Sequence, residues 1–415
     1  MGKRSSINDT ALTDAIRSVG VGKHGSRDLK EDQISRVLIE LKNGPSELVR
    51  GAFFGSLIAK GPSSIEKSLE SALEEGVFSR PDRLSAILCD GAPLEIVEIC
   101  AELIGGGELS YDRALRLGRF LFSDEKGEGA RGLAAAILRV RYETDAEYAG
   151  ILDAIAETIL PAFASVDRPR LPIVQLAEPF DGVERSYLLT PLIARFLNQR
   201  GYTPVSLTGR SGGPKMQMNL EDLARSLGGV FFSPEKGFET SSPEWGYFLS
   251  QKDVSTALDA WVERRRLIVK RPFLATLERF VNPLAADLLI ASAFHAPYAE
   301  KMAVIAEHAG FKAGIILRRG QEGTLSFSLN RPAEIVAFVR KPEGTRRHAF
   351  SWNPEGHGYP LEEDGRIESP QASDNADLIR KFVGTPTEID PRMRKRMEVT
   401  LLGIGFALDW IEANR

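Results

Sequence analysis

Cysteine and long apolar runs are both scarce in this sequence of 415 residues. The two cysteines, Cys89 and Cys100, have apolar neighbours in a segment that is predicted to be helical, which favours reduced core thiols over a disulfide. No apolar run approaches the length of a membrane span, and the opening residues, MGKRSSINDT, lack the apolar core of a signal peptide. The sequence therefore predicts a cytoplasmic protein with no membrane partner.

Histidine is rare as well, and its positions do not suggest a metal site. The five histidines, His24, His295, His308, His348 and His357, lack the paired spacing that zinc sites use. The last two stand in a polar stretch, where surface histidines are far commoner than zinc ligands. We therefore predict no metal site built on histidine.

An excess of positive charge is the third absence. The chain has 53 Lys and Arg against 57 Asp and Glu, which gives a net charge of −4 and a pI near 5.9. Such a chain is not drawn to nucleic acid as a whole, so any binding of this kind needs a local basic patch. Apolar residues make up 43% of the chain, as in ordinary globular proteins. Its length predicts two or three domains.

Helical periodicity dominates the first part of the chain. Up to about residue 165, apolar residues recur at three- and four-residue steps. Two stretches about 80 residues apart resemble each other. Each has a polar-capped helix, an Arg-Gly pair (Arg50-Gly51 or Arg131-Gly132) and an apolar helix that ends in a base. The sequence therefore predicts a duplicated helical domain, with copies at residues 1–75 and 76–165.

A different pattern begins at about residue 168, and we assign residues 166–415 to a third domain. Short apolar segments that read as strands, LPIVQL, TPVSLTG, LIVKR and AGIILRRG, alternate with helical segments. This alternation predicts an α/β fold with a mostly parallel sheet covered on both faces. Residues 344–374 are polar and predict a long surface excursion, whereas residues 391–415 predict a long helix that docks on the sheet.

Four motifs carry a resemblance to a known family. They are IRSVGVGKHGSRDLKEDQ, LLTPLIARFLNQRGYTPVSLTG, VKRPFLATLERFVNPL and FHAPYAEKMAVIAEHAGFKAGIILRRGQEG. The sequence resembles glycosyltransferase family 3, in particular its branch of anthranilate phosphoribosyltransferase-like proteins, some of which bind nucleic acid. The resemblance implies a helical amino-terminal domain, an α/β domain of the anthranilate phosphoribosyltransferase and nucleoside phosphorylase type, and a homodimer formed through the helical domain.

The catalytic motifs of the family are altered at each corresponding place. The enzymes wrap the pyrophosphate of phosphoribosyl pyrophosphate in a Gly-Thr-Gly-Gly-Asp loop, because only glycine lets the backbone approach so closely. Here the loop reads AEPFDG, with Glu178, Asp181 and one glycine, Gly182. LTGRSGGPK replaces the family's Lys-His-Gly-Asn motif. The family's magnesium-binding Asp-Glu pair is replaced by RRGQEG, in which Glu322 is the single acid. We therefore expect no cofactor, with magnesium only if transferase activity is retained.

Several residues of this region remain candidates for binding a ligand. Arg271 stands where the family places an arginine at its aromatic acid substrate, and it either clamps an anion or forms an ordinary salt bridge. The loop at 209–215 either presents backbone N–H groups to an anion or is a plain connection. The predicted anion- or ligand-binding residues are Asp181, Gly182, Arg210, Ser211, Gly212, Gly213, Lys215 and Arg271.

Basic clusters are the sequence feature that suggests a polyanion partner. The predicted nucleic-acid-binding residues are Lys23, His24, Arg27, Arg264, Arg265, Arg266 and Lys270, and a further cluster holds Arg392, Arg394, Lys395 and Arg396. Each cluster is equally compatible with a solvated surface. Two hypotheses follow: a non-catalytic paralogue that binds the phosphate backbone of DNA or RNA, or a glycosyl or phosphoribosyl transferase with a changed donor or acceptor. A protein-interaction scaffold is a third.

Overall fold

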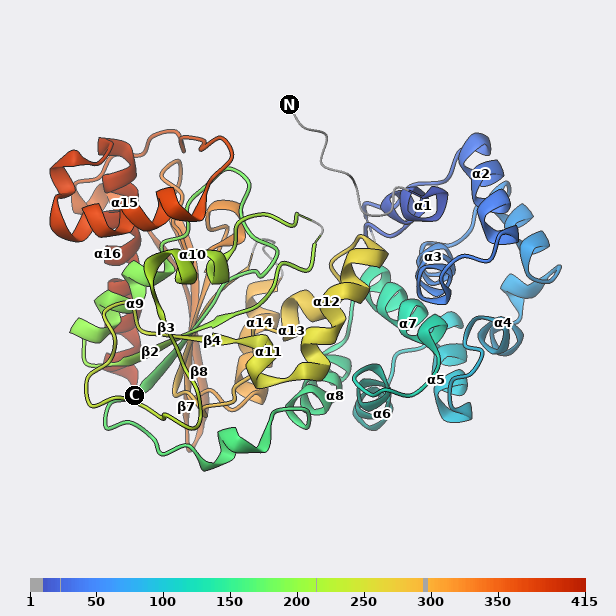
Figure 1. The fold of residues 1–415 in the computed structure, drawn as a ribbon, viewed down its shortest axis with the longest axis horizontal. Helices are drawn as coiled ribbons and strands as arrows, with labels where there is room; N and C mark the ends of the chain where they lie inside the picture. Colours follow the sequence, from blue (N-terminus) through green and yellow to red (C-terminus); the bar gives the residue numbers. More distant parts are fainter. Residues whose placement is uncertain (1–9, 23, 214, 294–297) are drawn as a thin grey trace. The chain divides into compact units, whose positions relative to one another are not determined.

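The computed structural model describes residues 10–22, 24–213, 215–293 and 298–415. The chain divides into two compact units, which we call the helical unit and the α/β unit (Figure 1). The helical unit comprises Met1–Thr158, Gly212–Pro214 and Ala260–Leu277, and the α/β unit comprises Ile159–Ser211, Lys215–Asp259 and Glu278–Arg415. Residues 260–277, which we predicted within the third domain, thus cluster with the helices.

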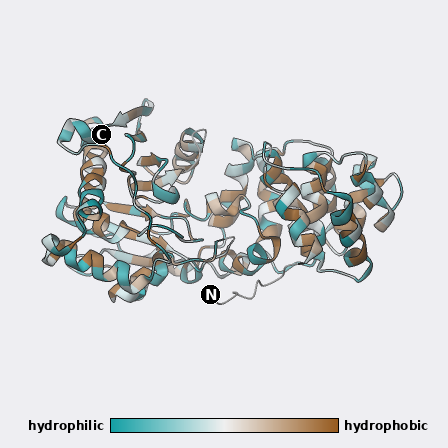
Figure 2. Ribbon diagram, turned by 90° about the horizontal axis from the view of Figure 1, so that it is seen from above, coloured by the Kyte–Doolittle hydropathy of each residue, from teal (hydrophilic) through white to brown (hydrophobic). Residues whose placement is uncertain are grey.

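The helical unit is built from short amphipathic helices. Figure 2 shows apolar residues in brown alternating with polar residues in teal along them, as expected for helices that bury one face. In chain order the elements are α1 (Ala11–Val19), α2 (Glu31–Lys42), α3 (Glu47–Lys60), η1 (Glu66–Ala72), η2 (Val77–Ser79), α4 (Pro81–Leu88), α5 (Leu94–Ile104), α6 (Tyr111–Leu121), α7 (Glu128–Arg141) and α8 (Asp145–Ala156), joined by most of α12 (Thr256–Ile268) and by α13 (Leu274–Leu277).

The two halves of the helical unit share one arrangement of neighbours. Helix α1 packs on α2 and α3, and α5 packs in the same way on α6 and α7. Likewise α2 packs on η1, and α6 packs on α8. Each partner element lies about 80 residues further along the chain, which is the spacing of the repeat in the sequence. This correspondence supports the predicted duplication.

A buried ion pair recurs at the same offset. In each half, a fully buried glutamate binds the base at the end of the preceding apolar helix and accepts a hydrogen bond from the backbone N–H of a leucine. In the first half these residues are Glu66, Lys60 (2.8 Å) and Leu29 (2.8 Å), and in the second they are Glu147, Arg141 (2.6 Å) and Leu109 (2.9 Å). The base that the sequence places after each apolar helix is therefore a partner for a buried acid.

Glycines let helices α3 and α7 cross in close contact. A Cβ added to Gly51 would lie 2.0 Å from the carbonyl oxygen of Gly129, and one added to Gly132 would lie 2.0 Å from that of Leu48. The offset of about 80 residues exchanges these two contacts, because it relates Gly51 to Gly132 and Leu48 to Gly129. Residue pairs exchange in this way across the interface of a twofold dimer. The two close contacts between α3 and α7 are therefore related to each other by the offset of the repeat.

The α/β unit is organised around a mixed sheet of eight strands among the described residues, in the order β3-β4-β2-β1-β5-β6-β7-β8. Strands β1 to β6 are parallel, and β7 and β8 are antiparallel to their neighbours. This confirms the predicted α/β fold with a mostly parallel sheet. The strands are β1 (Ile173–Ala177), β2 (Thr203–Thr208), β3 (Val230–Phe231), β4 (Tyr247–Ser250), β5 (Leu288–Ala293), β6 (Ala313–Arg318), β7 (Ala333–Lys341) and β8 (Gly344–Trp352).

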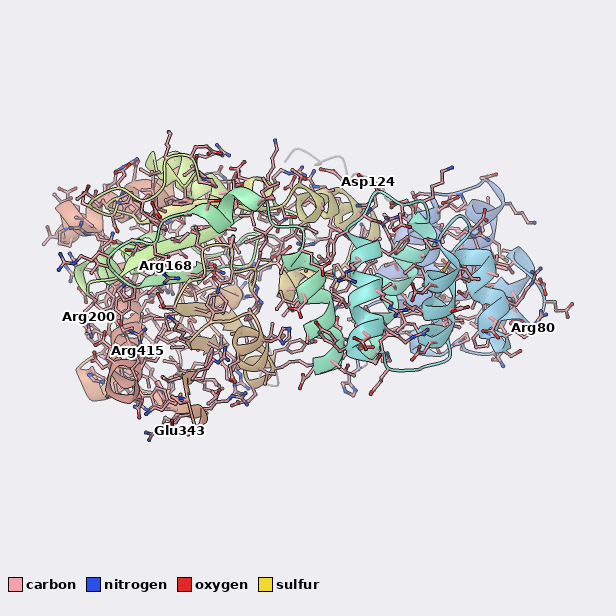
Figure 3. All side chains as sticks on the ribbon, turned by 90° about the horizontal axis from the view of Figure 1, so that it is seen from below. Arg80, Asp124, Arg168, Arg200, Glu343 and Arg415 are labelled. Carbon is pink, nitrogen blue, oxygen red and sulfur yellow. The ribbon has the colours of Figure 1, made fainter. Side chains whose placement is uncertain are left out.

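Helices cover the sheet and close its core. They are α9 (Thr190–Gln199), α10 (Leu220–Leu227), α11 (Gln251–Val254), α14 (Tyr298–His308), α15 (Ala372–Gly384) and α16 (Pro391–Asn414), with 3₁₀ turns η3 (Pro161–Ser165), η4 (Gln321–Gly323), η5 (Pro354–His357) and η6 (Pro386–Glu388). Helix α16 packs on α9 and β7, as its apolar residues predict. Near the end of α16, Arg200 binds Asp409 (2.6 Å) and Glu412 (2.9 Å), and the guanidinium of Arg415 lies over the ring of Tyr202. Figure 3 labels Arg200 and Arg415.

Two local predictions are wrong. The segment LIVKR is not a strand, because Leu267 and Ile268 end helix α12 and Val269 adopts a left-handed conformation (φ 49°). A run of three apolar residues is too short to distinguish a strand from a helix end. Residues 344–352 form strand β8 in place of a surface excursion. This edge strand is mostly exposed and polar, so it carries no apolar alternation for the sequence to reveal.

Candidate functional site

The loop after strand β1 is the first part of the candidate site, and Glu178 is its first residue. The side chain is fully buried. Its carboxyl group accepts a hydrogen bond from the Thr190 hydroxyl (2.6 Å), in the first turn of α9, and others from the backbone N–H of Leu325 (3.1 and 3.2 Å). Burial raises the pKa of Glu178 to about 7, although these hydrogen bonds act in the opposite direction. An internal carboxyl group thus uses one donor at the beginning of α9 and one backbone donor at Leu325.

The rest of this loop packs tightly against the loop after β2. The ring of Phe180 covers Gly209, where an added Cβ would lie 2.7 Å from it. The amide of Asn219 donates to the carbonyl oxygens of Phe180 (2.9 Å) and Gly209 (2.8 Å) and so joins the two loops. Gly182 has a φ of 84°, and a Cβ there would lie 2.4 Å from the carbonyl oxygen of Met218. This glycine serves close packing within the chain.

Glu322 is the acid of the altered magnesium motif, and donors surround it. Its carboxylate accepts hydrogen bonds from the backbone N–H groups of Glu184 (3.1 Å) and Arg185 (2.9 Å) and from the hydroxyl of Ser186 (2.7 Å). The ammonium of Lys215 lies 3.2 Å away. Burial alone would raise the pKa of Glu322, but the donors from Ser186 and Arg185, with the charge of Lys215, hold it below its usual value. We call residues 184–186 together with Lys215 the 184–186 nest. The nest therefore binds an anionic group of the same chain, the carboxylate of Glu322.

The remaining residues of the predicted anion loop also have internal partners. Arg210 binds Asp259 (2.8 Å), and the Ser211 hydroxyl donates to the carbonyl oxygen of Asp181 (3.4 Å). Gly212 and Gly213 belong to the helical unit, where the carbonyl oxygen of Gly213 accepts a hydrogen bond from Arg265 (3.3 Å). Among the residues predicted to bind an anion, Lys215 is the one whose side chain contacts Glu322. Arg271 belongs to the helical unit, and its side chain is exposed.

Most of the predicted basic clusters are used in ion pairs. Arg264 binds Glu128 (2.7 Å) and Arg266 binds Glu263 (3.0 Å), whereas Arg265 is 2% exposed. His24 and Arg27 are exposed, and Lys23 lies outside the described residues. In the further cluster, Arg396 binds Asp364 (3.0 Å), Lys395 binds Glu362 (3.3 Å), Arg394 lies 3.8 Å from Glu398, and Arg392 is exposed. Tertiary contacts thus neutralise most of these arginines.

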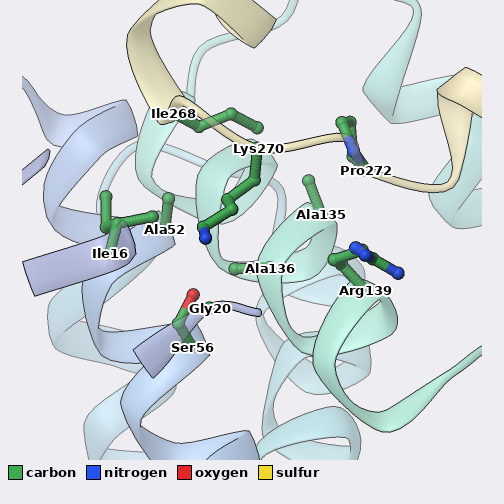
Figure 4. A pocket seen from close by; sticks show the side chains of 10 residues that line it. All are labelled: Ile16, Gly20, Ala52, Ser56, Ala135, Ala136, Arg139, Ile268, Lys270 and Pro272. Atoms are coloured by element: carbon green, nitrogen blue, oxygen red, sulfur yellow. The ribbon is translucent and has the colours of Figure 1, made fainter. Parts of the chain in front are cut away.

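A different basic group gathers around Lys270 in the helical unit. Lys270 and Arg139 line a small cavity of about 10 Å³, room for one water, together with Ser56 and other small or apolar side chains (Figure 4). The ammonium of Lys270 points toward Ser56 and donates to the carbonyl oxygen of Arg17 (3.0 Å). Burial, with the charges of Arg139 and Arg17, lowers the pKa of Lys270 to about 8. We call Arg17, Arg139 and Lys270 the Lys270 cluster.

Sequence reasoning named Lys270 and missed its two neighbours. Arg17 lies in the last turn of α1 and Arg139 in the last turn of α7, far from Lys270 in the sequence. Among the described residues, no acid lines the cavity, and the acid bound to the cluster is Asp14, 2.7 Å from Arg17. Bases in the last turns of helices are a common pattern because they favour the helix dipole. Such a signal does not reveal which helix ends meet.

The residues present do not suit a magnesium ion. Within the part of the chain that the structure describes, no three His, Cys, Asp or Glu side chains converge as metal ligands. Glu322 already faces N–H groups and an ammonium, which repel a cation.

Both cysteines are buried and free, as predicted. Over the same described ranges, no helix is long and apolar enough to cross a membrane.

Comparison with solved structures identifies the fold. Anthranilate phosphoribosyltransferase from Thermus thermophilus aligns with a TM-score of 0.54 at 20% identity, covering 74% of this chain and 87% of that chain. The enzyme from Saccharomyces cerevisiae, solved in complex with PRPP and Mg, aligns with a TM-score of 0.59 at 14% identity, covering 75% and 88%. The fold is that of anthranilate phosphoribosyltransferase.

Sequence comparison gives the same name at lower coverage. An anthranilate phosphoribosyltransferase from Trichlorobacter lovleyi is 29% identical over 161 residues, which are 39% of this chain and 43% of that protein. No family model matches the chain. The anthranilate phosphoribosyltransferase-like resemblance predicted from the four motifs is therefore confirmed at the level of the fold.

Proposed function

We propose that this chain is a non-catalytic, anthranilate phosphoribosyltransferase-like protein that binds the phosphate backbone of nucleic acid through the Lys270 cluster. The observation that carries the binding proposal is that Arg139 and Lys270 line a cavity that none of the described acids lines, with Arg17 beside them, since its carbonyl oxygen accepts a hydrogen bond from Lys270. The proposal has two parts, the absence of phosphoribosyl transfer and the binding of a polyanion, and different residues support each part.

Internal carboxylates support the absence of phosphoribosyl transfer. A diphosphate needs glycine backbone and free donors at the loop after β1. Here Glu178 accepts hydrogen bonds from Thr190 and Leu325. Glu322 accepts hydrogen bonds from the donors of the 184–186 nest. The Glu322 carboxylate would repel a diphosphate at the same donors unless a cation intervened, and no three of the described His, Cys, Asp or Glu side chains converge as metal ligands. These contacts therefore oppose the binding of phosphoribosyl pyrophosphate as the donor substrate.

Electrostatics of the Lys270 cluster support polyanion binding. Three cationic side chains near one another repel, and the lowered pKa of Lys270 reflects burial together with this repulsion. A phosphate group that approaches these side chains from the surface would offset the repulsion. Exposed Arg27 and Arg271 of the same unit add positive charge. Contacts of this kind read the backbone and tolerate any sequence, since phosphates carry no base information.

The test is binding of labelled single- and double-stranded DNA, and of RNA, measured by fluorescence anisotropy at several salt concentrations. We expect affinity to fall steeply with salt, because each neutralised phosphate releases counterions. Arg17→Gln, Arg139→Gln and Lys270→Gln combined should weaken binding to every sequence. The salt slope should become shallower by about one unit for each phosphate that the variant no longer neutralises.

A matched control removes three other positive charges from the helical unit. Arg80, Arg83 and Arg119 lie outside the Lys270 cluster and are each bound to a glutamate. Because they do not belong to the proposed site, their replacement by glutamine should leave binding nearly unchanged. An equal loss of affinity in both triple variants would mean that net charge alone governs binding, and would reject the cluster. Absence of any complex at low salt would reject nucleic-acid binding altogether.

The alternative is a transferase with a changed donor or acceptor. It is supported by the fold and by the names of the relatives. Thermal-shift measurements with phosphoribosyl pyrophosphate, nucleotides and aromatic acids distinguish the two functions. Stabilisation by phosphoribosyl pyrophosphate with magnesium would favour the transferase, whereas stabilisation by an oligonucleotide alone favours the proposed function.

A further inference from the structure

Strand β8 is an edge of the sheet, and among the described residues no strand pairs with its outer side. The strand is 9 residues long, Gly344–Trp352, and it pairs with β7 along its whole length. In an antiparallel pair, the backbone groups of alternate residues point away from the partner strand. The N–H and C=O groups on the outer side of β8 therefore form a row that can pair with a further strand.

One face of β8 carries cationic and aromatic side chains that lie against helix α16. The guanidinium of Arg346 lies 5.9 Å from the centre of the Trp410 ring, and the ring of Phe350 meets that of Phe406 at 5.2 Å. His348, between them along the strand, stacks on Trp410. Phe406 remains 45% exposed. A strand added beside β8 would therefore meet positive charge at Arg346 and an apolar surface at Phe350 and Phe406.

A groove of about 610 Å³ continues this apolar surface along α16. Phe406 lines the groove together with Leu402, Tyr359 and Phe382. Pockets of this size with a mostly apolar lining accept large apolar groups. The groove begins beside the edge strand, since Phe406 contacts Phe350 of β8. It can therefore hold an apolar side chain of an added strand.

Charge on this edge selects the kind of partner. The turn end of the β7–β8 hairpin, residues 340–347, carries one acid, Glu343, and four bases, Arg340, Lys341, Arg346 and Arg347. Glu307 of α14 binds Arg347 (2.7 Å), and the edge keeps a net positive charge. Like charges on neighbouring strands repel, so such an edge disfavours a basic strand, including β8 of a second copy of this chain. An acidic strand is attracted by the same side chains.

We propose that β8 is a docking edge for an extended acidic segment of a partner protein, which adds to the sheet as a further strand. Main-chain hydrogen bonds to β8 supply affinity, and the side chains that face α16 supply specificity. Side chains four positions apart on a strand share one face. The matching segment therefore carries an acid opposite Arg346 and a large apolar residue four positions away, opposite Phe350. This surface belongs to the α/β unit, so the proposal is independent of nucleic-acid binding at the Lys270 cluster.

The test uses two fluorescein-labelled peptides of about ten residues with the same composition. Both consist of threonine with one glutamate and one phenylalanine, which stand four positions apart in the first peptide and three in the second. We expect fluorescence anisotropy to show that the first peptide binds about tenfold more tightly, because in the second the two side chains point to opposite faces. Equal binding of both peptides, or no binding of the first at low salt, would overturn the proposal.

Matched variants test the edge itself. Arg346→Glu should weaken binding of the first peptide about tenfold, since an attraction becomes a repulsion, and Arg346→Gln should weaken it less. Arg225→Glu is the control, because Arg225 is also exposed and lies over an aromatic ring, that of Phe231 (4.9 Å), but at the opposite edge of the sheet. It should bind the peptide as the unchanged chain does. An equal loss in Arg225→Glu, or in the triple glutamine variant of the Lys270 cluster, would overturn the proposal, since net charge would then explain the binding.

Discussion

Replacing Glu178 by glutamine should remove a pH-dependent loss of stability from the α/β unit. The carboxyl group is fully buried, and burial raises its pKa to about 7 from the ordinary value of 4.5. Below pH 4.5 the group is protonated in both the folded and the unfolded chain. As pH rises toward 7, the unfolded chain loses this proton first, so the folded state loses stability throughout that interval. Glutamine does not ionise, so the unfolding free energy of the variant lacks this pH-dependent contribution.

The magnitude follows from the size of the shift. A difference of this size in pKa corresponds to about 3 kcal/mol between acid and neutral pH, as an order of magnitude. Glutamine can still accept the hydrogen bond from Thr190, but its amide group meets the N–H of Leu325, which costs roughly 1 kcal/mol at every pH. The signature is therefore the slope. Glu178→Gln should gain about 3 kcal/mol relative to the unchanged chain between acid and neutral pH.

The assay is guanidinium unfolding at several pH values, followed by tryptophan fluorescence. The chain has four tryptophans, and Trp261 lies in the helical unit. A Trp261→Phe background leaves Trp245, Trp352 and Trp410 to report on the α/β unit, which avoids mixing two transitions. Glu388→Gln changes an exposed carboxylate of the same unit and controls for charge. A difference between Glu178→Gln and the unchanged chain that stays constant with pH would refute the reasoning.

Three further outcomes concern the helical unit. Gly132→Ala should destabilise it by about 1–3 kcal/mol or more, because its Cβ would meet the carbonyl oxygen of Leu48 at 2.0 Å; Gly384→Ala, whose Cβ meets no described atom within 4 Å, should not destabilise the chain in the same thermal melts. Glu147→Gln should cost about 3 kcal/mol in denaturant unfolding, since it leaves Arg141 without its buried partner. Glu66→Gln should cost less, because Lys60 keeps Asp28 at 2.6 Å; a larger loss for Glu66→Gln would contradict this reasoning. Because the repeat offset exchanges the two glycine contacts between α3 and α7 within one chain, we expect a monomer in sedimentation equilibrium, in place of the homodimer that the resemblance implies; a dimer would refute this inference.

The sequence by itself determined the α/β fold of this protein. Alternating apolar strands and helices predict a parallel sheet because the two periodicities are local. The single glycine of AEPFDG was likewise readable from residue type alone, and it is the basis of the proposal that this loop does not bind a diphosphate. The Arg-Gly pairs were also visible as a repeat. These features depend on neighbours along the chain, which is why they were readable without a structure.

Only the tertiary structure decided which charges are available. Glu322 reaches donors of residues 184–186 from more than 130 positions away in the sequence, and Arg264 meets Glu128 across a similar separation. Lys270 acquires Arg17 and Arg139 as neighbours because two helix ends converge on it. Whether an ionic side chain binds a ligand or another part of the chain depends on which surfaces pack together. Burial and proximity of this kind arise from folding, and no local pattern of residues encodes them.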